Sequence, residues 1–230
     1  MPSLPPAIEL ASTGRGKGPL VVGLHDLGKT GVSMQMELSG LGKRFRVVAP
    51  DLRGHGSSPI PKAPWSVDDF SSDVSRVVKN EGGNAVVAGR GLGAAAAVAM
   101  ALGHPDTVRG LVLTGLGAKP EDEPRSDQWT HLAQSIRDEL GAEGLALATE
   151  AFGRRPDWRK ALSQVTVPVL VLAGAKDRVV PPAAQRELAM WFPNGSFLSV
   201  PDTDHLVPGK YLVDAVRSLS GSPAVATRAA

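Results

Sequence analysis

The chain has 230 residues, 42% of them apolar and 21% charged, and its formal net charge is +2. This size and composition predict one globular domain and exclude a disordered chain. The 25 basic residues are spread among 23 acidic ones without a basic block, so we expect no nucleic acid and no membrane surface as a partner. The absence of cysteine excludes disulfides, thiolate metal ligands and a cysteine nucleophile.

The N-terminal sequence lacks the basic start and apolar stretch of a secretion signal, and no apolar run is long enough to span a bilayer. We therefore expect a cytoplasmic protein, a monomer or a homodimer, that acts on a small molecule. No spacing of histidine and acidic residues is typical of a metal site, and we expect no cofactor.

Short apolar runs alternate with helical stretches along the chain. This pattern is typical of an α/β protein whose mostly parallel sheet has helices on both faces. Runs with almost no polar interruption indicate strands that are buried on both sides. The predicted strands cover residues 20–25, 46–51, 84–89, 108–115, 167–174 and, more weakly, 196–202.

Three helices are predicted between these strands. Residues 67–80 repeat apolar side chains at helical spacing, and an alanine-rich helix that can pack closely on a sheet starts at Leu92. A third helix has Pro182 in its first turn, where a missing N–H costs nothing. Residues 118–164 are polar and helical without a strand candidate. We expect them to form a small helical lid within a single domain of residues 1–230.

The strand at 84–89 runs into Gly89-Arg90-Gly91-Leu92-Gly93 and then into the alanine-rich helix. This strand–turn–helix context is that of a nucleophile elbow, whose pattern is G-x-S-x-G. With this turn and four other segments in the expected order, the chain resembles the α/β-hydrolase superfamily, in particular its esterase- and lactonase-like serine hydrolases. The other segments are LHDLG at 24–28, DLRGHGSS at 51–58, GAKDRVVP at 174–181 and Asp204-His205.

The resemblance implies an α/β-hydrolase fold with a catalytic triad, in which Asp177 is the acid and His205 the base. It also implies an oxyanion hole made by the backbone N–H groups of Leu27 and Leu92. The second of these opens a helix, where free N–H groups favour developing negative charge. The nucleophile position holds Gly91, which has no side chain, so no acyl-enzyme can form there.

Substrate contacts are predicted around this centre. We expect Asp26, in the turn after the first predicted strand, to contact the substrate. In the insertion, Trp129, Leu132 and Phe152 make an apolar acyl or aromatic pocket plausible. His25 and His55 are interpreted as structural residues of their turns, and Arg53 as the anchor of a loop.

Three functions stay open for this site. The leading hypothesis is a hydrolase of a small ester, lactone or thioester whose nucleophile has been lost naturally or replaced in the laboratory. A non-hydrolytic lyase, isomerase or cyclase would use the pair His205 and Asp177 as general base. The space left by the missing side chain of Gly91 would then hold a substrate atom, or a water that attacks an ester directly. A pseudoenzyme would only bind a ligand.

Overall fold

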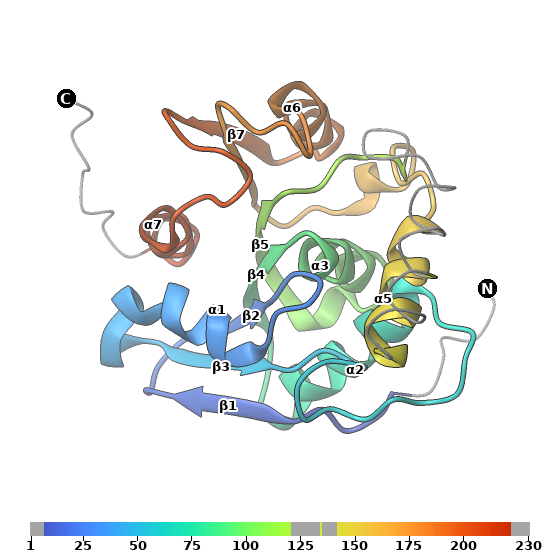
Figure 1. The fold of residues 1–230 in the computed structure, drawn as a ribbon. Helices are drawn as coiled ribbons and strands as arrows, with labels where there is room; N and C mark the ends of the chain where they lie inside the picture. The colour runs from blue at the N-terminus through green and yellow to red at the C-terminus, as the bar shows by residue number, and fades with distance from the viewer. Residues whose placement is uncertain (1–6, 121–133, 135–141, 222–230) are drawn as a thin grey trace.

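The computed structural model describes residues 7–120, 134 and 142–221. Within these residues seven strands form one sheet in the order β1-β3-β2-β4-β5-β6-β7 (Figure 1). The pair of β1 and β3 is antiparallel, and every other pair of neighbours in this described sheet is parallel. The strands are β1 (Ser12–Arg15), β2 (Leu20–Leu24), β3 (Arg46–Pro50), β4 (Ala85–Arg90), β5 (Val108–Thr114), β6 (Val169–Gly174) and β7 (Gly195–Val200).

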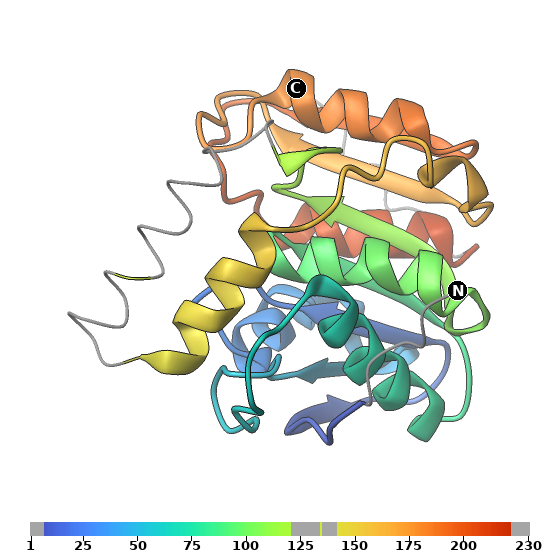
Figure 2. The ribbon, with the colours of Figure 1, turned by 90° about the vertical axis from the view of Figure 1, so that its right-hand side faces the viewer.

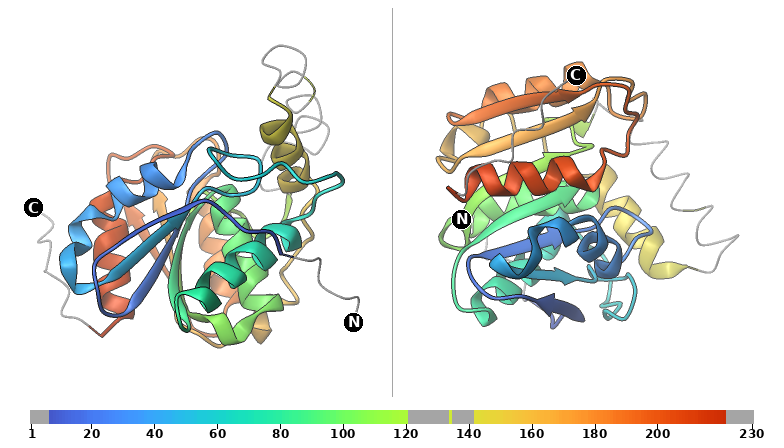
Figure 3. Two further views of the ribbon diagram at one scale, coloured as in Figure 1. Left: turned by 90° about the horizontal axis from the view of Figure 1, so that it is seen from below. Right: turned by 90° about the vertical axis from the view of Figure 1, so that its left-hand side faces the viewer.

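Helices cover both faces of the sheet (Figures 1 and 3). On one face lie α1 and α7, and on the other lie α2, α3 and α6. The helices are α1 (Gly31–Glu37), α2 (Val67–Asn80), α3 (Leu92–Gly103), α5 (Glu143–Gly153), α6 (Pro182–Trp191) and α7 (Gly209–Leu219), with short 3-10 segments at η1 (Ser39–Arg44), η2 (Pro105–Thr107) and η4 (Leu162–Gln164).

The central strands are buried on both sides, as their apolar runs predict. Val21 and Val47 pack under α1 and α7, whereas the next residues, Val22 and Val48, belong to the core beneath α2 and α3. Successive side chains of a strand point to opposite faces, so both positions must be apolar. The predicted α/β-hydrolase architecture is confirmed.

The carboxyl ends of the parallel strands meet at one edge of the sheet, where open α/β sheets carry their sites. Helix α5 lies beside this edge (Figure 2). Its first turn touches the loops there: a Cβ on Gly144 would come within 2.4 Å of the carbonyl oxygen of Gly54. Of the predicted insertion 118–164, residues 121–133 and 135–141 lie outside the described residues, so the lid stays a prediction.

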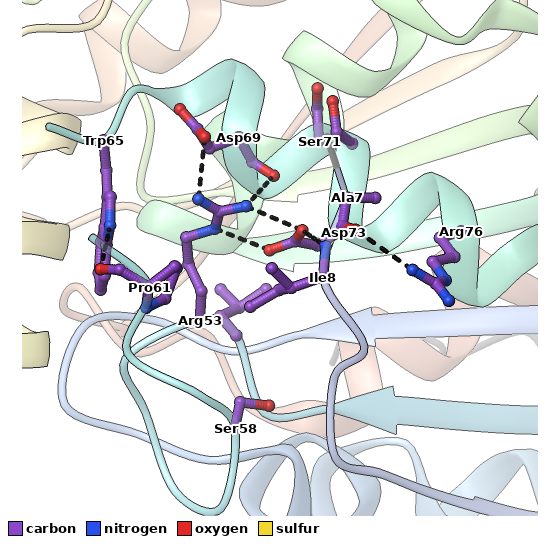
Figure 4. Close-up of polar contacts among 12 residues, drawn as sticks. Ala7, Ile8, Arg53, Ser58, Pro61, Trp65, Asp69, Ser71, Asp73 and Arg76 are labelled. Atoms are coloured by element: carbon purple, nitrogen blue, oxygen red, sulfur yellow. Dashed lines mark hydrogen bonds and ion pairs between the residues drawn. The ribbon is translucent and has the colours of Figure 1, made fainter. Parts of the chain in front are cut away.

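Arg53 ties the loop after β3 to helix α2 (Figure 4). Its Nε and Nη2 donate to the two carboxylate oxygens of Asp73 at 2.7 and 2.8 Å, and its Nη1 donates to Asp69 at 2.9 Å. Asp73 also accepts the backbone N–H of Ile8 at 2.7 Å. One buried carboxylate therefore joins the N-terminal segment, the loop and the helix, which confirms Arg53 as a loop anchor.

Among the described helices, none combines the length and the apolar character needed to cross a membrane.

Candidate active site

Gly91 forms the elbow between β4 and α3. Its backbone has φ 45° and ψ −111°, a conformation that costs glycine less than other residues. The flanking glycines are required by close backbone approach. A Cβ on Gly89 would lie 2.5 Å from the carbonyl oxygen of Gly93, and a Cβ on Gly93 would lie 2.3 Å from that of Leu24. The elbow expected from the sequence is present.

The acid, Asp177, follows β6 and is buried. Its Oδ1 accepts the backbone N–H groups of Val179 at 2.9 Å and Val180 at 3.0 Å. Its Oδ2 accepts one hydrogen bond from Nδ1 of His205 and another from Nε2 of Gln185, each at 2.9 Å. Burial alone raises the pKa of a carboxyl group, but the hydrogen bonds from His205 and Val180 hold the pKa of Asp177 below its ordinary value. The carboxylate is thus fixed in place and ionised.

His205 follows β7, and its Nδ1 donates to Asp177, so Nε2 is the nitrogen left for proton transfer. The hydrogen bond with Asp177 raises the pKa of His205; burial opposes this, and the charges of Asp177 and Asp26 add to the rise. The ring also needs space beside β5. A Cβ on Gly115, where φ is +68°, would lie 2.9 Å from Cε1 of His205.

Arg90, at the end of β4, holds the loop that carries His205. Its Nη2 donates to the carbonyl oxygen of Val207, and its Nε donates to Glu37 at 2.6 Å. The guanidinium therefore connects the elbow, helix α1 and the loop after β7 beneath the site.

Asp26 occupies the centre of the site. Its Oδ1 accepts the backbone N–H of Leu27 at 2.8 Å and that of Leu92 at 3.1 Å. The structure thus brings together the two N–H groups predicted as an oxyanion hole, and a carboxylate oxygen of the protein itself sits on them. The other oxygen, Oδ2, lies 3.9 Å from Nε2 of His205.

The same carboxylate fills the space that a nucleophile side chain would need. A Cβ built on Gly91 would lie 2.0 Å from Oδ1 of Asp26 and 2.5 Å from its Cγ. The expectation that the missing side chain leaves room for a water or a substrate atom is therefore wrong. The residue predicted to contact substrate, Asp26, stands where the serine of the G-x-S-x-G pattern would stand.

His25 fixes the peptide that presents the N–H of Leu27. Its Nε2 accepts the backbone N–H of Leu52 at 2.9 Å, so Nδ1 carries the proton and donates to the carbonyl oxygen of Asp26 at 2.8 Å. Burial lowers the pKa of His25 to about 4, which keeps the ring neutral. His55 is also buried and meets His25 edge-on at 4.9 Å between ring centres. Both are structural, as interpreted from the sequence.

A narrow cleft beside the elbow is lined by His205 and Asp26. A wider groove of about 710 Å³ continues from His205 along the loop after β6, where Lys176 and Arg178 are exposed. The hydroxyl of Thr114 is buried in the cleft lining and has no hydrogen-bond partner within the described chain. The cleft is lined by Asp26, Arg90, Gly91, Thr114, Gly115, His205 and Leu206.

Of the other predicted substrate contacts, the structure describes one, and it does not line this cleft. Phe152 lies on α5 and is packed in the core, with the guanidinium carbon of Arg155 4.5 Å from its ring centre. Its role in substrate binding stays a prediction. Trp129 and Leu132 fall outside the described residues. Across the described ranges, no three histidine or acidic side chains gather closely enough to hold a metal ion.

Gln185 is a site residue that the sequence does not reveal. It is fully buried on α6, donates to Asp177, and accepts the backbone N–H of Gly115 at 2.8 Å. It thereby sets the distance between the acid and the glycine that faces the histidine ring. A glutamine in an amphipathic helix is usually exposed, so no sequence signal marks it.

The model of the Alpha/beta hydrolase family matches residues 21–211. The chain belongs to this family. A 2-(acetamidomethylene)succinate hydrolase from Mesorhizobium japonicum is 27% identical to it over 84% of each protein. A 3-oxoadipate enol-lactonase from Acinetobacter baylyi is 24% identical over 75% of this chain and 77% of the lactonase. A thermophilic esterase from Thermogutta terrifontis superposes with a TM-score of 0.83 at 24% identity, over 92% of this chain and 93% of the esterase.

Proposed function

We propose that this α/β-hydrolase family member hydrolyses a small ester, lactone or thioester, with His205 and Asp177 as its general base. The observation that carries the proposal is the hydrogen bond of 2.9 Å between Nδ1 of His205 and Oδ2 of Asp177, which leaves Nε2 at the cleft. The relatives named as a hydrolase and an enol-lactonase support this class of substrate.

In this reaction, His205 accepts a proton from water at Nε2, and the buried carboxylate of Asp177 stabilises the imidazolium that forms. Both carboxylate oxygens of Asp177 are held by other donors, so it keeps the ring oriented. No acyl-enzyme forms at Gly91, which has no nucleophilic atom.

An enolate-forming lyase, isomerase or cyclase would place its enolate oxygen on the N–H groups of Leu27 and Leu92, and both already donate to Asp26. A substrate oxyanion in ester hydrolysis would meet the same occupied donors, so the assay below separates the two reactions. A pseudoenzyme has no evident use for a histidine that Asp177 orients and whose pKa the two nearby carboxylates raise, and it becomes an outcome of the experiment below.

The experiment is a hydrolysis assay on p-nitrophenyl acetate, p-nitrophenyl butyrate, γ-butyrolactone and S-phenyl thioacetate. We expect turnover of at least one of these by the wild-type protein, and a loss of roughly 100-fold or more in His205→Ala. His104→Ala, at the far end of α3, is the matched control and should keep full activity. No turnover by folded wild-type protein, or equal activity in His205→Ala, would contradict the proposal.

The pH profile gives a second test. A general base works when deprotonated, so activity rises as pH increases through the pKa of His205. Because Asp177 and Asp26 raise that pKa, we expect the midpoint above the ordinary histidine value of 6.5. Asp177→Asn should move the midpoint down and reduce kcat. A rate that is flat from about pH 5 to 8 argues against His205 as base.

A further inference from the structure

We propose, resting on the hydrolase function above, that the nucleophile of the reaction is Asp26. Its Oδ2 attacks the acyl carbon of the substrate, and water activated by His205 then attacks Cγ of Asp26. The nucleophile thus comes from the loop after β2 instead of the elbow.

The position of the carboxylate is the first observation. The three side-chain atoms nearest to a Cβ on Gly91 all belong to Asp26: Oδ1 at 2.0 Å, Cγ at 2.5 Å and Oδ2 at 2.7 Å. The group that faces the acid–histidine pair is therefore a carboxylate, which is itself a nucleophile in covalent catalysis. Its side chain is 23% exposed and lines the cleft beside Gly91 and His205.

The two oxygens of this carboxylate are held differently, which is the second observation. Oδ1 accepts both N–H groups of the hole, those of Leu27 and Leu92. Oδ2 receives no hydrogen bond from any described residue and faces Nε2 of His205 at 3.9 Å. One oxygen is anchored, and the other is free to form a bond.

The anchoring fits the second half of the reaction. When water attacks Cγ, negative charge develops on Oδ1, which already lies 2.8 and 3.1 Å from two backbone donors. Donors placed where charge develops are the main source of such stabilisation. The hole therefore serves the carboxyl group of Asp26 and not the carbonyl of the substrate. His205, on the Oδ2 side, is placed to deprotonate the water.

Both steps of the reaction conserve atoms and electrons. Oδ2 attacks the acyl carbon, and the alcohol or thiol leaves with the bonding electron pair and takes a proton from solvent. The product of this step is an anhydride between the acyl group and Asp26. His205 takes one proton from water, and the hydroxide adds to Cγ. The bond between Cγ and Oδ2 breaks, the carboxylate product leaves with the former Oδ2, and His205 and Asp26 return their protons to solvent.

The test follows the oxygen atoms through one turnover. Enzyme in excess is mixed, in heavy-oxygen water, with the member of the assay panel that it hydrolyses fastest. The carboxylate product and the peptide that carries Asp26 are then analysed by mass spectrometry. We expect an unlabelled product and one heavy oxygen on Asp26. A labelled product with an unlabelled Asp26 would overturn the proposal and would mean that water attacks the substrate directly.

Two variants keep the test decisive. Asp26→Asn retains an oxygen acceptor for Leu27 and Leu92 but is a far weaker nucleophile, so we expect a loss of roughly 100-fold or more. Asp106→Asn is the matched control; it lies exposed at the opposite end of the sheet and should keep full activity. In His205→Ala the first step survives and the second is blocked, so an acyl adduct on Asp26 should accumulate in the intact mass.

The outcomes separate the two proposals. Full activity in Asp26→Asn, or no adduct in His205→Ala, overturns Asp26 as nucleophile and leaves the hydrolase function standing. No hydrolysis of any panel member by the wild-type protein removes the hydrolase function, and the role of Asp26 falls with it.

Discussion

At the elbow, the Asp26 carboxylate and any side chain at position 91 compete for one volume. A glycine there is therefore more than a missing nucleophile, because it is the residue that admits the carboxylate. This steric relation is a physical reason for glycine at position 91.

The competition can be measured by substitution. We expect Gly91→Ser to lose on the order of 1 to 3 kcal/mol of stability, because a side chain is strained at φ 45° and the new Cβ must displace the Asp26 carboxylate from Leu27 and Leu92. The double variant Asp26→Gly, Gly91→Ser removes that clash and frees the N–H groups of Leu27 and Leu92. Thermal denaturation and labelling by a fluorophosphonate check both points, with fast labelling expected only in the double variant. Equal labelling of the single variant would show that Asp26 yields its place readily.

Several site residues could be predicted because each follows a recognisable strand end. Asp177 and His205 are such residues, and the structure joins them by a hydrogen bond. The position of the Asp26 side chain could not be predicted. It depends on an N–H group 66 residues away in the chain, at Leu92, and on the space left by Gly91. No local pattern contains that information.

Among the elements, helix α2 carries the pair that fixes the loop after β3. We expect Arg53→Met to cost about 3 to 5 kcal/mol, since it leaves Asp73 buried without its cation. Arg46→Met is the matched control: its pair with Glu81 is partly exposed, and its loss should cost about 1 kcal/mol or less. Urea denaturation of both variants gives the comparison. Similar losses in the two would mean that burial of the Asp73 pair adds nothing.

The elements that can be predicted are those whose own residues show an apolar run or an apolar face. The strands β2 to β6 are apolar runs, and α2 repeats its apolar face, so the sequence predicts each of them to within about two residues. The sequence does not predict strand β1, because its residues, STGR, are all exposed and none of them is a large apolar residue. It is a strand because it pairs with β3 in the antiparallel direction, and a short stretch of sequence carries no sign of a pairing with a distant segment.

For the whole molecule, the titration of the buried histidines sets how stability changes with pH. The folded pKa of His25 is lowered from 6.5 to about 4, so its protonation favours the unfolded chain. Its contribution is complete above about pH 6.5 and falls as the pH drops toward 4; between about pH 7 and pH 5 the loss is roughly 2 kcal/mol. Burial lowers the pKa of His55 in the same direction.

His205 acts in the opposite direction, because its pKa is raised: its contribution is present at low pH and is lost as the pH rises through the folded pKa. We nevertheless expect the protein to lose stability on acidification, since the pKa values of three described histidines, His25, His55 and His104, are lowered and that of His205 is raised. In His25→Gln, whose amide oxygen can still accept the N–H of Leu52, the loss between about pH 7 and pH 5 should be smaller. Melting temperatures at the two pH values test this, and an unchanged loss would contradict it.

The pairing of Asp26 with Gly91 also has a genetic consequence. In the α/β-hydrolases that the chain resembles, the oxyanion turn is of the His-Gly type and the elbow pattern G-x-S-x-G carries serine. Glycine and aspartate codons differ by one base, as do serine and glycine codons, so two point mutations separate that pattern from this site. The steric conflict at the elbow determines which of the two mutations comes first. A lineage that reaches this arrangement loses the serine first and gains the aspartate second, because the reverse order passes through a crowded site.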